Sequence, residues 1–241
     1  MSKTFLEQWV AGNTVAQGAA KQHEFNIYIP PLLETLRILK ARSVVDFQAD
    51  EGVVSVAFCA QSSLNSAIFV PPNPIDDPEG TFRSMAENIT SPMRETGQVR
   101  LVATADDIAD ASVDAILLNN ILGCQATLEN VEMIAATAGR VVKQGGHVII
   151  TVPNAHGGEF SSYSCSNLPP KNAHGSTYDF QMRGEDAVFK NLYLSVKGLR
   201  ELFKRHGFDT LVGTPVMDQA YDGVRSKKPS FHQYAASRLA P

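Results

Sequence analysis

We begin with the run Ser43-Val44-Val45-Asp46-Phe47-Gln48-Ala49-Asp50-Glu51-Gly52. Its first five residues predict a short buried strand, since the run is too short and too unperiodic for a helix. A polar turn follows, and a second apolar segment, expected to be a helix, begins at Val53. A strand that leads through a tight turn into a helix is the first unit of an open α/β sheet. Ligands bind such sheets at the carboxyl ends of the strands.

The acid at the end of this strand and the turn after it are candidates for ligand binding. Asp46 can accept hydrogen bonds from a hydroxyl or ammonium group, or it can cap the next helix, where a negative charge suits the dipole. Glycines in the turn would let a ligand approach the backbone closely. Only Gly52 is present, while Gln48 and Asp50 stand where glycine is expected. Gly52 serves either ligand clearance or close packing of helix on strand.

Composition limits the class of protein. The 241 residues are 44% hydrophobic, which suits one α/β domain with a sizeable core. A net charge of -4 disfavours a general nucleic-acid binder, which would show a basic face. The three cysteines are widely spaced without metal-ligand spacing, so we expect reduced thiols, no metal and a cytoplasmic location. No stretch predicts a membrane span or a secretory signal.

The rest of the chain alternates between predicted strands and helices. Residues 1–26 are expected to form a helical extension, and residues 27–241 the main domain. Residues 155–190 are rich in Gly, Ser, Asn and Pro, which predicts a long functional or mobile loop that serves as a lid or an insertion. Predicted helices cover residues 32–39, 53–61, 81–96, 127–143 and 196–206. Predicted strands cover residues 43–47, 66–70, 99–103, 113–118, 147–152, 208–216 and 231–239.

This order resembles the class I S-adenosylmethionine-dependent methyltransferases over roughly residues 27–239. Three segments carry the resemblance: the strand and turn at 44–52, the strand and following residues at 112–122, and the helix, double-glycine turn and strand at 138–150. The family's fold is a Rossmann-like seven-stranded mixed sheet with helices on both faces. The departures from the family lie in the glycine-rich loop, and at the second strand's end, where Val70 and Pro71 replace the usual acid.

The resemblance implies S-adenosylmethionine as cofactor and a set of residues that would bind it. These are Asp46, Gln48, Gly52, Asp106, Asp107 and Asn119. Asp106 and Asp107 also suit a solvated loop, and Asn119 also suits a turn.

Three residues of the 155–190 loop are candidates for the catalytic role. His156 and His174 could take a proton from the acceptor, although a histidine in a loop is more often simply solvated. Tyr178 could belong to an aromatic lid over a substrate, or it could pack the loop down.

The sequence therefore supports two functional hypotheses. The first is methyl transfer to a small molecule or glycan precursor, with a homodimer as a candidate assembly and with neither nucleic acid nor membrane as a partner. The second is a methyltransferase-like protein that transfers no methyl group, and instead acts as a binding or partner subunit or catalyses another reaction. Fold alone does not choose between them.

Overall fold

The computed structural model describes residues 31–47, 66–70, 99–102, 104–157, 163–182, 186, 188–209, 211–216, 229 and 231–240. The predicted extension at 1–26 and the predicted helices at 53–61 and 81–96 lie outside these residues. So does the turn at 48–52, including Gln48 and Gly52.

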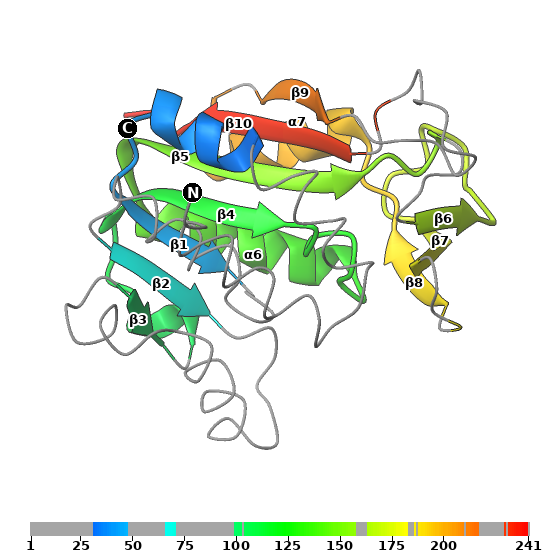
Figure 1. Ribbon diagram of the computed structural model, residues 1–241, viewed down its shortest axis with the longest axis horizontal. Helices are drawn as coiled ribbons and strands as arrows, with labels where there is room; N and C mark the ends of the chain where they lie inside the picture. The colour runs from blue at the N-terminus through cyan, green and yellow to red at the C-terminus, as the bar shows by residue number, and fades with distance from the viewer. Residues whose placement is uncertain are drawn as a thin grey trace, which may run out of the picture.

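A mixed sheet forms the centre of the molecule (Figure 1), as the sequence predicted. Its seven strands run in the order β3-β2-β1-β4-β5-β10-β9. The strands from β3 to β5 pair in parallel, whereas β10 is antiparallel to both β5 and β9. Their bounds are β1 (Ser43–Phe47), β2 (Ser66–Val70), β3 (Val99–Leu101), β4 (Val113–Asn119), β5 (Val142–Pro153), β9 (Val212–Val216) and β10 (Phe231–Ser237).

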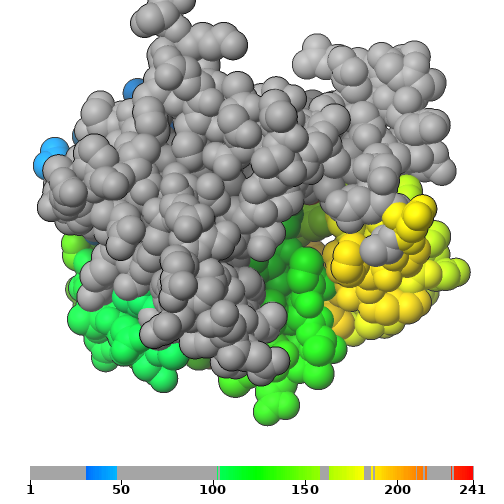
Figure 2. All heavy atoms as spheres, turned by 60° about the horizontal axis from the view of Figure 1, so that its bottom comes forward, coloured from blue at the N-terminus to red at the C-terminus, as the bar shows by residue number. Residues whose placement is uncertain are grey.

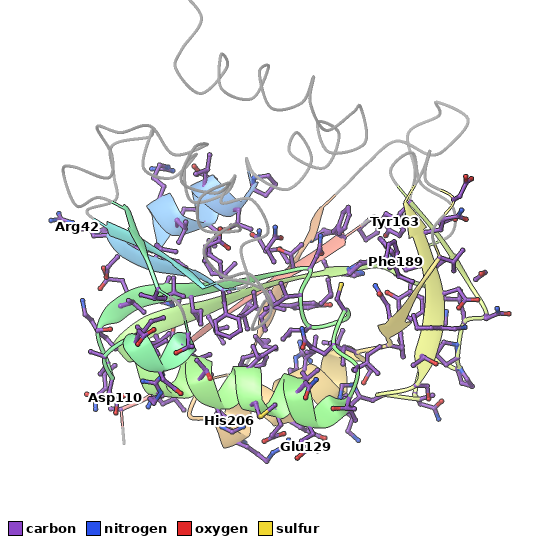
Figure 3. The ribbon with its side chains drawn as sticks, turned by 90° about the horizontal axis from the view of Figure 1, so that it is seen from below. Arg42, Asp110, Glu129, Tyr163, Phe189 and His206 are labelled. Carbon is purple, nitrogen blue, oxygen red and sulfur yellow. The ribbon has the colours of Figure 1, made fainter. Side chains whose placement is uncertain are left out.

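Helices cover both faces of this sheet (Figure 3). A helix at residues 31–38 packs on one face, where Leu32 and Leu36 meet Val44, Ala115 and Ile149. The helices α6 (Leu128–Val141) and α7 (Val196–Arg205) pack on the other face. Alternate residues of each strand point to opposite faces, so the period of two decides which side chains meet which helix.

Side-chain caps set where α6 and α7 begin. Thr127 accepts a hydrogen bond from the backbone N–H of Asn130, and Ser195 accepts one from that of Gly198. The predicted helix at 127–143 ends earlier than expected, at Val141. The next strand begins at Val142 rather than at His147, because Val142 already pairs with Val113 of β4.

Asp114 ties together the amino ends of β1 and β4. Its carboxylate accepts hydrogen bonds from the backbone N–H groups of Ser43 (2.9 Å) and Arg42 (3.0 Å) and from the Lys143 ammonium (3.0 Å). Burial alone would raise the pKa of Asp114, but these donors outweigh it and lower the pKa to about 2. The ligand-binding edge predicted from the sequence is the opposite end of the same strands.

The prediction of a long loop at 155–190 is wrong. This segment contributes to a second, three-stranded antiparallel sheet of β6 (Tyr163–Ser166), β7 (Thr177–Met182) and β8 (Phe189–Leu192). Tyr163 stacks on Phe180 and also contacts Phe231 of β10, so aromatic side chains hold this small sheet against the large one. The strands are only four to six residues long and are separated by Asn, Pro and Gly, which hid them in the sequence.

The small sheet lies beyond the carboxyl ends of β4 and β5 (Figure 1). The backbone N–H of Leu192 in β8 donates to the carbonyl of Gly123, in the loop that follows β4 (2.7 Å). In the space-filling view the residues of the small sheet, in yellow, stand next to the green residues between β4 and α6 (Figure 2). The segment is therefore placed beside the edge where a ligand is expected.

Candidate functional site

Two of the residues singled out in the sequence, Asp46 and Asn119, lie at the carboxyl edge of the sheet, as does Asn154. Asp46 is the fourth residue of β1, Asn119 is the last residue of β4, and Asn154 directly follows β5. Asp46 pairs in register with Leu117, so Asn119 lies two residues nearer the edge, on the same face. Asp46 is 3% exposed, which is unusual for a carboxylate, so it is a candidate for a binding role.

A row of polar side chains crosses the sheet at Asn119. Asn119 is in register with Thr151 of β5, which is in turn opposite Gln233 of β10. All three point to the face that carries the helix at 31–38, beyond the apolar cluster of that face. Thr151 is fully buried and Gln233 is 3% exposed.

The polar atoms of this row lack partners. Asn119 Oδ1, Thr151 Oγ1 and Gln233 Nε2 are buried without a hydrogen-bond partner among the described residues. Gln233 is held at its other amide atom, since the Thr35 hydroxyl donates to Oε1 at 2.7 Å. A buried polar atom without a partner costs about 1–3 kcal/mol. The three atoms lie on β4, β5 and β10, which are neighbours in the sheet. Unpaired, they lower the stability of the fold, whereas a polar ligand could supply the missing hydrogen bonds.

Thr151 and Gln233 are not among the candidate residues predicted from the sequence. The signal was present, because Thr151 interrupts the apolar run from Val148 to Val152 and Gln233 stands between His232 and Tyr234 in a strand that is largely buried. A polar residue inside a buried strand needs a partner. Only the strand pairing brings the two residues together.

Asp106 and Asp107 take different positions on the edge of the loop after β3. Asp107 closes a capping box on η1 (Ala105–Asp107), because its carboxylate accepts from the Thr104 backbone N–H while Thr104 caps the turn. Asp106 is 98% exposed and lies 3.8 Å from Arg140. Arg140 fastens this loop to α6 by donating to the carbonyls of Ile108 and Ala105, each at 2.7 Å.

His156 lies just past the end of β5 and keeps an unused nitrogen. Its Nε2 is buried and has no hydrogen-bond partner in the described part of the chain. The ring packs edge-on against Tyr193, with centroids 5.0 Å apart. Burial and, secondarily, the nearby Lys171 ammonium hold the pKa of His156 below its usual range, so the ring is neutral at pH 7 and able to accept a proton.

His174 has a structural role instead. Its Nδ1 accepts a hydrogen bond from the Ser195 backbone N–H (3.0 Å), at the start of α7. Gly198 leaves room for the ring, since a Cβ at that position would collide with it. Burial and, less strongly, Arg205 lower the pKa of His174 against the opposing effect of Glu201, which keeps Nδ1 available as an acceptor.

Tyr178 is packed inside the small sheet. It is 2% exposed, lies opposite Asn191 of β8 and hydrogen-bonds to that residue. Burial raises the pKa of its hydroxyl far above the usual range, although the Asn191 bond opposes this. The position fits the packing role that the sequence left open, rather than proton transfer.

Neither a metal site nor a membrane-spanning helix was found in what the structure describes. No group of three or more His, Cys, Asp or Glu side chains there is arranged to hold a metal ion. None of the described helices is long and apolar enough to cross a membrane.

The arrangement of the large sheet and its helices is shared with many solved structures. A methyltransferase from Clostridium acetobutylicum matches 88% of this chain and 91% of its own, with a TM-score of 0.60 and 10% identity. This chain has the fold of the S-adenosylmethionine-dependent methyltransferases. A methyltransferase from Mesorhizobium loti matches 92% and 99% of the two chains, with a TM-score of 0.56 and 13% identity.

One further structure with this fold contains ligands. The Burkholderia thailandensis 1,6-didemethyltoxoflavin-N1-methyltransferase, with that substrate and S-adenosylhomocysteine bound, matches 98% of this chain and 86% of its own. Its TM-score is 0.55 and its identity 15%. No family model matches the sequence, and no curated protein does. The resemblance is therefore in the fold, and function has to be argued from the site.

Proposed function

We propose that this protein transfers a methyl group from S-adenosylmethionine to a small polar molecule. The main support for the proposal is a buried carboxylate, Asp46, near the carboxyl end of β1. The neighbouring strand β4 carries the unpartnered oxygen of Asn119 two residues farther toward the same edge. Ligands of open α/β sheets bind at the carboxyl ends of the strands, and one solved structure with this fold contains S-adenosylhomocysteine.

The described residues at this edge fit the polar groups of the cofactor. Asp46 and Asn119 offer a carboxylate and an amide oxygen, both acceptors, which suit ammonium and hydroxyl donors. Asp106 is exposed and lies 3.8 Å from Arg140, whereas Asp107 is used in its capping box; both stay in the proposed set. Gln48 and Gly52 complete the proposed cofactor-binding set from the turn after β1.

When bound, the cofactor supplies an electrophilic methyl group on a sulfonium. The acceptor's lone pair forms the new bond to the methyl carbon as the carbon–sulfur bond breaks, and S-adenosylhomocysteine leaves. The protein mainly has to hold the two reactants in line at about 3–3.5 Å. An acceptor that is a hydroxyl or a protonated nitrogen also has to lose a proton.

Of the three candidate bases, the geometry favours His156. Its Nε2 is unpartnered among the described residues and its lowered pKa keeps it neutral. Nδ1 of His174 is occupied at α7, and the Tyr178 hydroxyl is buried with a raised pKa. His156 is therefore our candidate for the proton acceptor, and His156→Gln should lower turnover at pH 7 by about 10²-fold or more.

A small acceptor is supported by the charge of the chain. The net charge of -4 provides no excess of positive charge for a nucleic-acid backbone. Small metabolites and glycan precursors are the classes that we favour.

Calorimetric titration with S-adenosylmethionine and S-adenosylhomocysteine tests the proposal directly. We expect binding to the wild-type protein, and a loss of about tenfold or more in affinity for Asp46→Ala, because a charge-assisted hydrogen bond is removed. Asp186→Ala, at an exposed position, is the matched control and should bind like the wild type. Absence of heat and of a thermal shift at millimolar cofactor would rule out methyl transfer.

A further inference from the structure

We propose that Thr151 and Gln233 form the recognition site for the methyl acceptor and bind an uncharged polar edge, such as a carboxamide or lactam. This inference rests on the proposed function, and it specifies the class of substrate. The site lies on the face of the sheet that the helix at 31–38 covers. Asn119 lies between this site and Asp46 along the sheet.

The burial of unpartnered polar atoms is the first support. Thr151 Oγ1 and Gln233 Nε2 are both buried, directly opposite each other across β5 and β10, and without a hydrogen-bond partner among the described residues. Valine and leucine would fill the same volumes without the cost of burying unpaired donors. Binding a ligand that supplies the missing hydrogen bonds would explain why polar side chains stand at these two positions, which packing alone does not explain.

The chemistry of the two groups indicates what they would bind. The Thr151 hydroxyl can donate or accept, and the Gln233 amide nitrogen donates. No charged side chain belongs to the cross-strand row of Asn119, Thr151 and Gln233. A charged ligand group would be buried there without a counter-charge, at a cost of several kcal/mol or more. An uncharged edge that carries both a carbonyl and an N–H or O–H group matches the row.

The position of the row fits the size of a small acceptor. Neighbouring strands are about 4.8 Å apart, so Thr151 lies about 5 Å and Gln233 about 10 Å from Asn119 along the sheet. With Asn119 on the cofactor side, a molecule of about one ring, anchored at Thr151 and Gln233, would extend toward the cofactor. The helix at 31–38 limits the site on one side, because Thr35 fixes the Gln233 amide.

Three benzene derivatives of similar size test this inference as probes. Benzamide has an uncharged carbonyl and N–H edge, acetophenone lacks the N–H donor, and benzoate is charged. Their binding would be measured by ligand-observed NMR, with and without saturating S-adenosylhomocysteine. We expect benzamide to bind in the millimolar range, with acetophenone at least threefold and benzoate at least tenfold weaker.

Thr151→Val tests the site itself, because valine keeps the shape and deletes only the hydroxyl. Affinity for benzamide should fall at least fivefold, while affinity for S-adenosylhomocysteine stays within twofold and the melting temperature is unchanged or higher. Thr137→Val on α6, which removes a hydroxyl bonded to the Met133 carbonyl, is the control and should leave benzamide binding unchanged. Gln233→Leu should repeat the loss seen for Thr151→Val.

The outcomes separate this inference from the proposed function. Failure of S-adenosylhomocysteine to bind refutes the proposed function. In that case the present inference is still tested, by comparing the benzamide affinities of the wild type and Thr151→Val without S-adenosylhomocysteine. Equal benzamide affinity in both proteins, benzoate binding as tightly as benzamide, or no probe binding at all would overturn the inference. If no probe binds and Thr151→Val has a higher melting temperature than the wild type, then the row of Asn119, Thr151 and Gln233 holds ordered water only.

Discussion

Replacing Asp114 by asparagine removes the charge that joins the amino ends of β1 and β4 while keeping the size of the side chain. The pKa of Asp114 falls from 3.8 to about 2 in the folded protein. A difference of about 1.8 corresponds to roughly 2–3 kcal/mol, at about 1.4 kcal/mol for each pKa unit. The side chain is 32% exposed, and solvent weakens its ion pair with Lys143, so we expect a loss of roughly 1–2 kcal/mol at pH 7.

The pH dependence of this loss follows from the direction of the shift. A carboxylate whose pKa is lowered by folding stabilises the protein above its unfolded value of 3.8, and this contribution disappears as the pH falls through about 2. The difference between wild type and Asp114→Asn should therefore shrink to about half of its neutral value by pH 3. Urea unfolding at pH 7, 5 and 3 measures it, with Asp186→Asn as an exposed, charge-matched control.

Two results would refute this reasoning. One is a variant as stable as the wild type at pH 7, which would mean that the three hydrogen bonds contribute nothing net. The other is a difference that stays constant from pH 7 to pH 3, which would mean that the effect comes from packing and not from the charge.

Three other features can be tested in the same way. Arg140→Lys keeps the charge but loses the forked donor to two carbonyls, so amide exchange in residues 104–110 should become at least tenfold faster, with that in β5 unchanged. His174→Ala should cost about 1 kcal/mol at pH 7, because a hydrogen bond at the start of α7 is lost. Since the pKa of His174 is lowered, its contribution is present above about pH 6.5 and lost below it, and a chemical-unfolding difference independent of pH between 5 and 8 would contradict this. Amides of β7, the central strand of the small sheet, should exchange more slowly than those of residues 167–176, and equal rates would contradict the strand pairing.

The large sheet was predictable because its signals are local. The β-branched runs of β1, β4 and β5 and the apolar period of α6 each identify an element without reference to the rest of the chain. The small sheet was missed because its strands are short and depend on distant partners. Tyr163, for example, is buried only through contact with Phe180 and Phe231.

The site was predictable only in part, for a related reason. Asp46 and Asn119 could be placed at the carboxyl edge because strand ends can be located in the sequence. Thr151 and Gln233 are 82 residues apart and meet only through an antiparallel pairing that the sequence does not specify. The histidines looked alike as loop residues, and they differ only in their neighbours: Ser195 binds Nδ1 of His174, while Nε2 of His156 has no partner in the described residues.

The small sheet enters from the end of β5 and leaves into the start of α7, so both of its connections lie at the same edge of the large sheet (Figure 1). An excursion with this topology can be exchanged without changing the strand order of the large sheet, because none of its strands belongs to that sheet. Its packing contacts with the rest of the molecule include Leu192 in the main core and Tyr163 against Phe231. Exchanging residues 155–192 for the corresponding segment of a methyltransferase with this fold, with Tyr163 and Leu192 kept, would place different side chains beside the same sheet. Selection, or a protein engineer, can therefore change the chemistry at the carboxyl edge while leaving the scaffold that Asp114 and α6 hold together intact.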